Sequence, residues 1–178
     1  LATIEAMLGR PLPPDWYGGF VVRRDAALAA KVRAVAGVAE AIGAIAAAGV
    51  PFAVASGADR AKMRVTLGAS GLLAQFAQRM FGADQVERSK PAPDVYLLAA
   101  GALGVSPSRC VVVEDTPTGT RAGVAAGAAV LGYCAASDPG ALLAAGAHGV
   151  FDDMRQLPAL VLEAAAPAVT TNPGAAWQ

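Results

Sequence analysis

The stretch Cys110-Val111-Val112-Val113-Glu114-Asp115 decides the fold of this chain. Its first four residues are apolar and follow one another without a polar interruption. A run of this kind is typical of a strand covered on both faces, as strands of a parallel sheet are. Two carboxylates follow directly, and open α/β sheets bind their ligands beyond the carboxyl ends of the strands.

Around this stretch, helical runs alternate with short apolar segments. Further strands are predicted at residues 52–55, 129–131 and 149–151. Helices are predicted at residues 37–48, 59–67, 72–79, 93–103, 118–126, 139–145 and 154–165. This alternation predicts an α/β fold built on a doubly wound parallel sheet.

The two ends of the chain do not follow the alternation. The amino-terminal part has a Pro-rich turn at 9–14, an aromatic patch with two glycines at 16–20 and a predicted helix at 25–35. These features predict the end of a separate helical element. The expected division is therefore residues 1–35 as helical remnant, 36–165 as α/β core and 166–178 as flexible tail.

Composition narrows the classes of function. The 178 residues are 55% hydrophobic and 16% charged, with a mean hydropathy of +0.47, which excludes a disordered chain. Lys+Arg and Asp+Glu are both 14, so the chain lacks the basic surface that nucleic acids or anionic membranes attract. No apolar stretch is long enough to span a membrane and no signal peptide is recognisable, so a cytoplasmic location is predicted.

Two segments are candidates for binding phosphate. Ser56-Gly57 follows a predicted strand, where a hydroxyl and backbone N–H groups at a helix start can bind an anion. The alternative is that Ser56 or Asp59 only caps the next helix. Lys90 stands before two closely spaced prolines, so its ammonium is preorganised to offset charge on a transferring phosphate. The alternative is a solvated loop lysine.

The third candidate is the acidic pair Glu114-Asp115. Adjacent carboxylates at a strand end provide the oxygen ligands that Mg²⁺ prefers. The alternative is that Asp115 or Thr116 caps the following helix. That alternative leaves Glu114 without a partner at the end of an apolar strand, so the metal site is favoured.

In combination, these motifs resemble the haloacid dehalogenase superfamily. The matching segments are Ser56-Gly57, Lys90-Pro91-Ala92-Pro93-Asp94 and Val111-Val112-Val113-Glu114-Asp115, followed by Gly119 and Ala122-Gly123. The intervals fit as well, with 34 residues from Ser56 to Lys90 and 24 from Lys90 to Glu114. The likeness runs from about residue 35 to 160 and is greatest to the small phosphatases and β-phosphoglucomutases that carry a helical cap.

The resemblance implies roles for these positions. Ser56 and the Gly57 N–H would bind the transferring phosphoryl group, and Lys90 would bridge that group and the nucleophile. Asp115, with Glu114, would hold Mg²⁺.

Two further expectations follow from the same resemblance. Arg60 would orient the substrate, and residues 1–35 would be a remnant of the helical cap.

One departure from the family is large. Members begin with a strand ending in Asp-x-Asp, which supplies the nucleophile and the general acid/base, whereas no two aspartates of this sequence lie two residues apart. That strand would lie between the strands leading to Ser56 and to Glu114. We therefore expect that an N-terminal stretch is missing, that the core lacks its first strand and that residues 1–178 alone are inactive.

The implied activity is Mg²⁺-dependent hydrolysis of a small phosphorylated metabolite, a sugar or sugar-acid phosphate, through an aspartyl-phosphate. A β-phosphoglucomutase-type phosphosugar mutase and a non-catalytic phosphate-binding module are the alternatives. The sequence predicts no nucleic-acid or membrane partner and leaves the substrate and the oligomeric state open.

Overall fold

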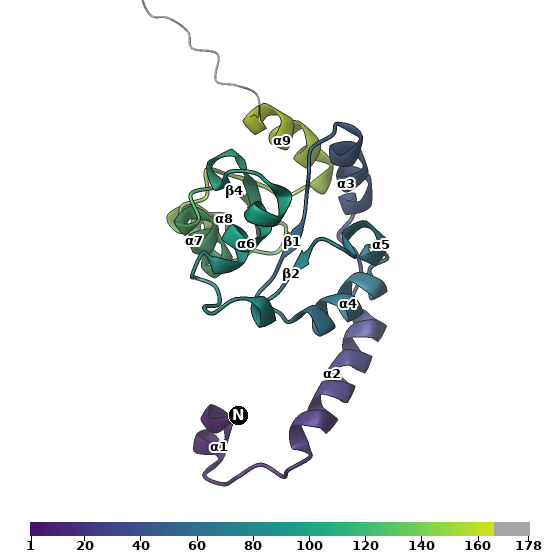
Figure 1. The fold of residues 1–178 in the computed structure, drawn as a ribbon, viewed down its shortest axis with the longest axis vertical. Helices are drawn as coiled ribbons and strands as arrows, with labels where there is room; N and C mark the ends of the chain where they lie inside the picture. The colour runs from purple at the N-terminus through teal and green to yellow at the C-terminus, as the bar shows by residue number, and fades with distance from the viewer. Residues whose placement is uncertain (166–178) are drawn as a thin grey trace, which may run out of the picture.

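The computed structural model describes residues 1–165, and the predicted tail at 166–178 lies outside them. The fold is α/β with parallel strands, as predicted (Figure 1). The strands form two sheets, one of β1 (Val54–Ala55) and β2 (Met80–Phe81), the other of β3 (Val111–Glu114), β4 (Ala129–Tyr133) and β5 (Gly149–Phe151) in that order.

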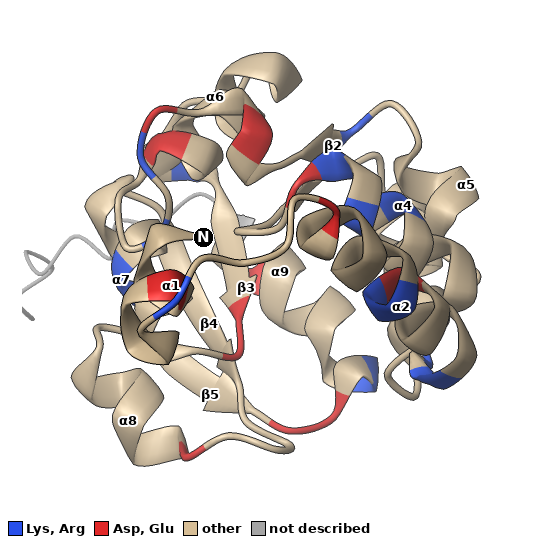
Figure 2. Ribbon diagram, turned by 90° about the horizontal axis from the view of Figure 1, so that it is seen from below, with Lys and Arg blue, Asp and Glu red and all other residues tan. Residues whose placement is uncertain are grey.

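Helices cover both faces of the strands. On one side α6, α7 and α8 follow one another, and on the other α3 packs against α9 (Figures 1 and 2). Asp59, Thr116 and Asp138 cap the starts of α4, α7 and α8 by accepting backbone N–H groups. The bounds are α3 Val38–Ala47, α4 Arg60–Ala69, α5 Leu73–Phe76, α6 Asp94–Leu103, α7 Pro117–Ala125, α8 Pro139–Ala144 and α9 Leu157–Ala165.

Helix α3 connects the two halves of the core. Its residues Ala41 and Ile45 pack with Phe151 and the buried side chains of α9, whereas Ile42 packs with a cluster around Met63 under β1 and β2. A third cluster, centred on Val112 and Val130, lies under the other sheet. Because α3 contributes to two clusters, it holds the sheets together although no strand within residues 1–165 joins them.

A slot separates β1 from β3. Val54 and Ser56 donate their N–H groups to the carbonyls of Arg79, just before β2, and of Phe81 in β2, and the Cys110 carbonyl accepts from β4. Since backbone groups alternate in direction along a strand, those of Ala55, Val111 and Val113 face the slot. Apolar residues of α3, α6 and α9 line the slot, whose volume is about 630 Å³. It is therefore an apolar space with a strand edge on each side and helices above and below.

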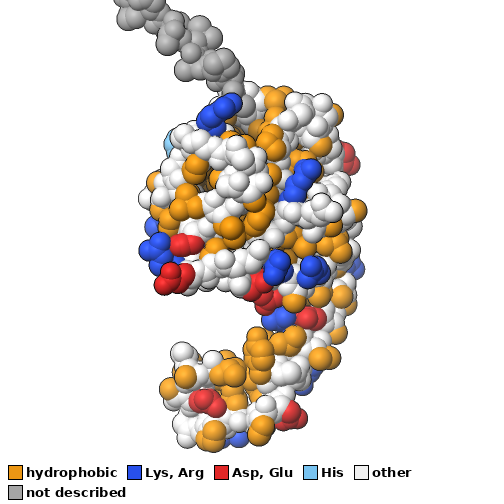
Figure 3. Space-filling model, in the orientation of Figure 1, with side chains coloured by type: hydrophobic (Ala, Val, Ile, Leu, Met, Phe, Trp, Pro, Cys, Tyr) orange, Lys and Arg blue, Asp and Glu red, His pale blue; other side chains and the backbone are white. Residues whose placement is uncertain are grey.

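The amino-terminal residues form an arm. Helix α1 (Ala2–Leu8) has no buried residue, and α2 (Trp16–Lys31) packs along α4. Apolar side chains gather on the arm, where Met7, Tyr17 and Phe20 are exposed (Figure 3). None of the helices in residues 1–165 is long and apolar enough to cross a membrane.

The structure corrects three predicted boundaries. The second helix begins at Trp16, not residue 25, because Trp16 and Phe20 stack one turn apart with ring centroids 5.3 Å from each other. The predicted helix 72–79 is only α5, and the unpredicted β2 follows it, because pairing with β1 outweighs local propensity. The last predicted helix is a 3-10 turn, Met154–Gln156, followed by α9.

Candidate active site

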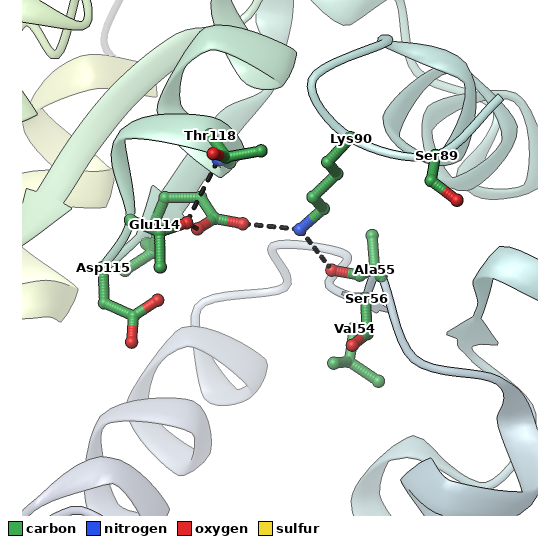
Figure 4. Close-up of a pocket in the computed structure, with 12 residues that line it drawn as sticks. Val54, Ala55, Ser56, Ser89, Lys90, Glu114, Asp115 and Thr118 are labelled. Atoms are coloured by element: carbon green, nitrogen blue, oxygen red, sulfur yellow. Dashed lines mark hydrogen bonds and ion pairs between the residues drawn. The ribbon is translucent and has the colours of Figure 1, made fainter. Parts of the chain in front are cut away.

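Five of the six predicted site residues line one pocket. It has a volume of about 530 Å³ and lies at the carboxyl ends of β1 and β3 (Figure 4). The loop that carries Lys90 closes it on a third side. The residues in question are Ser56, Gly57, Lys90, Glu114 and Asp115.

The Ser56-Gly57 loop is held between β1 and α4. The Ser56 hydroxyl accepts the Ala58 N–H at 3.1 Å, while Asp59 caps α4 by accepting the Lys62 N–H at 2.7 Å. The capping role considered for Ser56 therefore belongs to Asp59. The hydroxyl hydrogen of Ser56 has no acceptor in the described part of the chain, so it can be donated to a ligand in the pocket.

Arg60, the sixth predicted residue, does not line the pocket. Its backbone N–H and its Nε both donate to the Asp84 carboxylate at 3.0 Å, and this hydrogen bonding lowers the pKa of Asp84. Gly82 allows the close approach, because a Cβ there would lie 2.5 Å from Asp84 Oδ1 and 2.7 Å from the Ala58 carbonyl. The hydrogen bonds of Arg60 thus connect the start of α4 to the turn after β2.

The Lys90 ammonium makes three hydrogen bonds. It donates to the Ala55 carbonyl at 3.1 Å, to the Tyr96 hydroxyl at 2.8 Å and to Glu114 Oε1 at 2.5 Å. The Lys90 and Glu114 side chains are 13% and 9% exposed, so water screens this ion pair little. Lys90 is therefore a buried, fixed cation, not a solvated loop lysine.

Electrostatics at Glu114 and Tyr96 follow from this contact. Burial raises the pKa of the Glu114 carboxyl, but hydrogen bonds from Lys90 and Tyr96 and the charge of Lys90 outweigh it, so its pKa lies below the usual value. Burial and the neighbouring Glu114 charge raise the pKa of the Tyr96 hydroxyl, which stays protonated and donates to Glu114 Oε1.

Glu114 also packs on the first turn of α7. Its Oε2 accepts from the Thr116 hydroxyl at 3.2 Å, and Thr116 caps the helix through the Gly119 N–H at 3.1 Å. A Cβ at Gly119 would lie 2.0 Å from the Glu114 carboxylate, so this position has room only for glycine. The sequence did not indicate a partner for Glu114. In the structure that partner is Lys90, and Tyr96 lies beside it.

Asp115 is the carboxylate that is free to bind a cation. Its side chain is exposed to the pocket and accepts no hydrogen bond within residues 1–165, while its carbonyl accepts from Ser137 at 2.7 Å. Magnesium takes one or two carboxylates and completes its shell with water and phosphate oxygens, so Asp115 fits the ion, whereas both oxygens of Glu114 already accept hydrogen bonds. The described residues contain no cluster of three or more His, Cys, Asp or Glu that could hold a metal.

Sequence reasoning missed Tyr96. It lies in the apolar run Val95-Tyr96-Leu97-Leu98 of α6, where the pattern predicts that an aromatic residue belongs to the hydrophobic core. No spacing rule marks its hydroxyl, because the contact with Glu114 joins residues 18 apart.

A parallel α/β fold with a charged pocket at the carboxyl ends of its strands is typical of α/β enzymes, and a family model identifies the class. The model described as haloacid dehalogenase-like hydrolase matches residues 8–127, so the chain belongs to that family.

Curated relatives include two phosphatases of Escherichia coli. Hexitol phosphatase A is 41% identical over 91 residues, which cover 51% of this chain and 41% of that protein. Fructose-1-phosphate phosphatase YqaB is 43% identical over 77 residues, 43% of this chain and 40% of that protein. The chain thus spans about two-fifths of each of these relatives.

A solved structure extends the comparison over most of the chain. A HAD family hydrolase from Deinococcus radiodurans, with bound phosphate and sodium, matches with a TM-score of 0.75 and 36% identity. The match covers 92% of this chain and 74% of that one. The similarity therefore includes both sheets and the helices around them.

Proposed function

We propose that the pocket binds the phosphoryl group of a small phosphorylated metabolite and that the complete protein hydrolyses the ester with the help of Mg²⁺. The observation that carries this proposal is the convergence of Ser56, Lys90 and Asp115, from three separate segments, on one pocket. The names of the relatives, which include a 6-phosphogluconate phosphatase, support a sugar or sugar-acid phosphate as substrate.

The residues of this chain divide the work. Ser56 and the Gly57 N–H would donate to the phosphoryl oxygens and orient the group. Asp115, with Glu114 beside it, would hold Mg²⁺. When bound, the ion neutralises negative charge on the oxygens of the transferring group.

We further propose that the slot between β1 and β3 takes a strand whose carboxyl end carries the nucleophilic aspartate. The slot is apolar, and within residues 1–165 the N–H groups of Ala55, Val111 and Val113, which face it from both sides, donate to no other backbone group. A strand parallel to β1 and β3 would end beside Lys90. The first aspartate of Asp-x-Asp on this strand would attack phosphorus as the ester P–O bond breaks. The second aspartate would give its proton to the leaving alcohol and then take a proton from the water that hydrolyses the acyl phosphate. Residues 1–35 would then be part of a cap over this pocket.

A test compares residues 1–178 with a version extended at the amino end by an apolar strand ending in Asp-x-Asp. We expect the extended version to hydrolyse p-nitrophenyl phosphate with Mg²⁺, to stop on addition of chelator, and to lose about 100-fold or more in rate in Asp115→Asn. The matched control carries Asn-x-Asp in the strand and should be inactive, like residues 1–178.

The outcomes separate the candidate functions. Hydrolysis that survives chelator or Asp115→Asn contradicts the metal assignment. Phosphate binding without hydrolysis in the extended version favours a non-catalytic module. A panel of sugar phosphates, assayed for hydrolysis and for isomerised product, then distinguishes a phosphatase from a mutase.

A further inference from the structure

The Lys90 ammonium has no donor left for a ligand. An ammonium has three N–H groups, and here they meet the Ala55 carbonyl, the Tyr96 hydroxyl and Glu114 Oε1. A phosphate oxygen in the pocket can therefore reach Lys90 only after one of these acceptors leaves.

Two of the three acceptors are fixed. The Ala55 carbonyl belongs to β1, whose flanking residues Val54 and Ser56 are both hydrogen-bonded to β2 or to the residue just before it. The Tyr96 hydroxyl is presented by α6, its ring lines the apolar slot, and the Lys90 Nζ lies 4.5 Å from the ring centroid. The carbonyl cannot move without disturbing β1, and packing of the ring against the hydrophobic cluster under β3 and β4 holds the hydroxyl in place.

Glu114 is the acceptor that can leave. Its carboxylate is held by side-chain hydrogen bonds alone, from Lys90, Tyr96 and Thr116, so it can leave by rotation of its own side chain without any movement of β3. A phosphate dianion carries the same sign of charge, so it can replace Glu114 without leaving the buried ammonium unpaired. The released carboxylate then lies beside Asp115, where a cation would be held.

We propose that Tyr96 is a positioning residue, which together with the Ala55 carbonyl keeps the Lys90 ammonium at the pocket while Glu114 exchanges for a phosphate oxygen. The hydroxyl suits this task because it both accepts from Lys90 and donates to Glu114. Its bond to Lys90 does not depend on Glu114. The exchange with phosphate depends on the proposed function, whereas the anchoring of Lys90 does not.

The anchoring is measurable in residues 1–178. The chain has only three lysines, so ¹⁵N-lysine labelling gives three ammonium signals, of which Lys31 and Lys62 serve as internal references. We expect Tyr96→Phe to raise the hydrogen-exchange rate of the Lys90 ammonium on the order of tenfold, as loss of one hydrogen bond predicts. Tyr133→Phe is the matched control, because within residues 1–165 the Tyr133 hydroxyl makes no hydrogen bond. An unchanged Lys90 rate in a folded Tyr96→Phe protein overturns the proposal.

Inorganic phosphate, added with Mg²⁺, then tests the exchange. In the unsubstituted chain the Lys90 signal should shift, and in Tyr96→Phe the apparent affinity measured from that shift should fall, with Tyr133→Phe unaffected. Equal phosphate affinity of Tyr96→Phe and the unsubstituted chain overturns the positioning role of Tyr96. A Lys90 signal that never responds to phosphate contradicts the replacement of Glu114 by phosphate and the proposed pocket. It does not affect the conclusion on anchoring, which depends on the hydrogen-exchange rate of the ammonium.

In the extended, active version, Tyr96→Phe should lower kcat as well as raise KM, because Lys90 contacts the bound phosphoryl group and also acts on charge that develops in the transition state. A rise in KM alone would contradict that role.

Discussion

The Thr120 side chain carries a buried hydroxyl that has no hydrogen-bond partner in the described part of the chain. The side chain is fully buried in α7 and its Oγ1 makes no hydrogen bond within residues 1–165. Thr120→Val keeps the shape and removes the unsatisfied group, so we expect the free energy of unfolding to rise by about 1 kcal/mol. Denaturant unfolding measures it. Thr66→Val is the control, since the Thr66 hydroxyl donates to the Met63 carbonyl at 3.1 Å and its loss should not stabilise. Equal effects of the two substitutions would refute the explanation.

Gly119 protects the contact between Glu114 and Lys90. Gly119→Ala places a methyl group where the Glu114 carboxylate lies, so it should expel that carboxylate and cost about 1–3 kcal/mol of unfolding free energy. Gly101→Ala is the control in α6, where a Cβ meets nothing within 4 Å and should stabilise by about 0.5–1 kcal/mol. Thermal unfolding of both variants checks this, and a neutral Gly119→Ala would mean that Glu114 is not held there.

The Asp84–Arg60 pair predicts a pH dependence. Because Arg60 lowers the pKa of Asp84 in the folded protein, the pair stabilises the fold above the unfolded value near 3.8 and stops doing so as pH falls through the folded value. The melting temperature of Asp84→Asn should therefore lie below that of the unsubstituted chain at pH 7, and the difference should shrink below about pH 4. Asp152→Asn, whose carboxylate makes no ion pair within residues 1–165, should show no such trend.

At the scale of the elements, the slot predicts which amides are protected. The N–H groups of Ala55, Val111 and Val113 face the slot, whereas those of Ser56 and Ala129 donate to neighbouring strands. Amide hydrogen exchange should therefore be fast for the first three and slow for the other two. Adding the strand proposed above should slow the first three. Uniform protection in residues 1–178 alone would mean that the slot closes by itself.

The elements also show why part of the fold was predictable. The strand at Val111–Glu114 and the helices capped by Asp59 and Thr116 carry local signals, namely an apolar run and a capping side chain. The two-residue strand Met80–Phe81 carries none, because it exists only through its pairing with Val54–Ala55. The predicted start of α2 was wrong for a similar reason, since the first turns of this helix depend on an aromatic stack and on packing against α4.

At the scale of the whole molecule, the two sheets and the arm make an open shape. The sheets are joined through α3 and the surrounding helices instead of through a strand, and the arm extends from α4 with apolar side chains exposed (Figures 1 and 3). The pocket lies at the mouth of the slot, where β1 and β3 end.

The sequence by itself determined the α/β class and the Ser56-Gly57 and Glu114-Asp115 motifs of the pocket, because these depend on hydrophobic pattern and on residues close together in the chain. The absence of an Asp-x-Asp pair from the sequence is also the basis of the proposal that a further strand fills the slot. Only the tertiary structure decided that Arg60 binds Asp84, that Glu114 binds Lys90 and that the Tyr96 hydroxyl donates to Glu114. These contacts link residues 18 to 24 positions apart, and buried charges and hydroxyls choose partners by proximity in the fold, which no local pattern encodes.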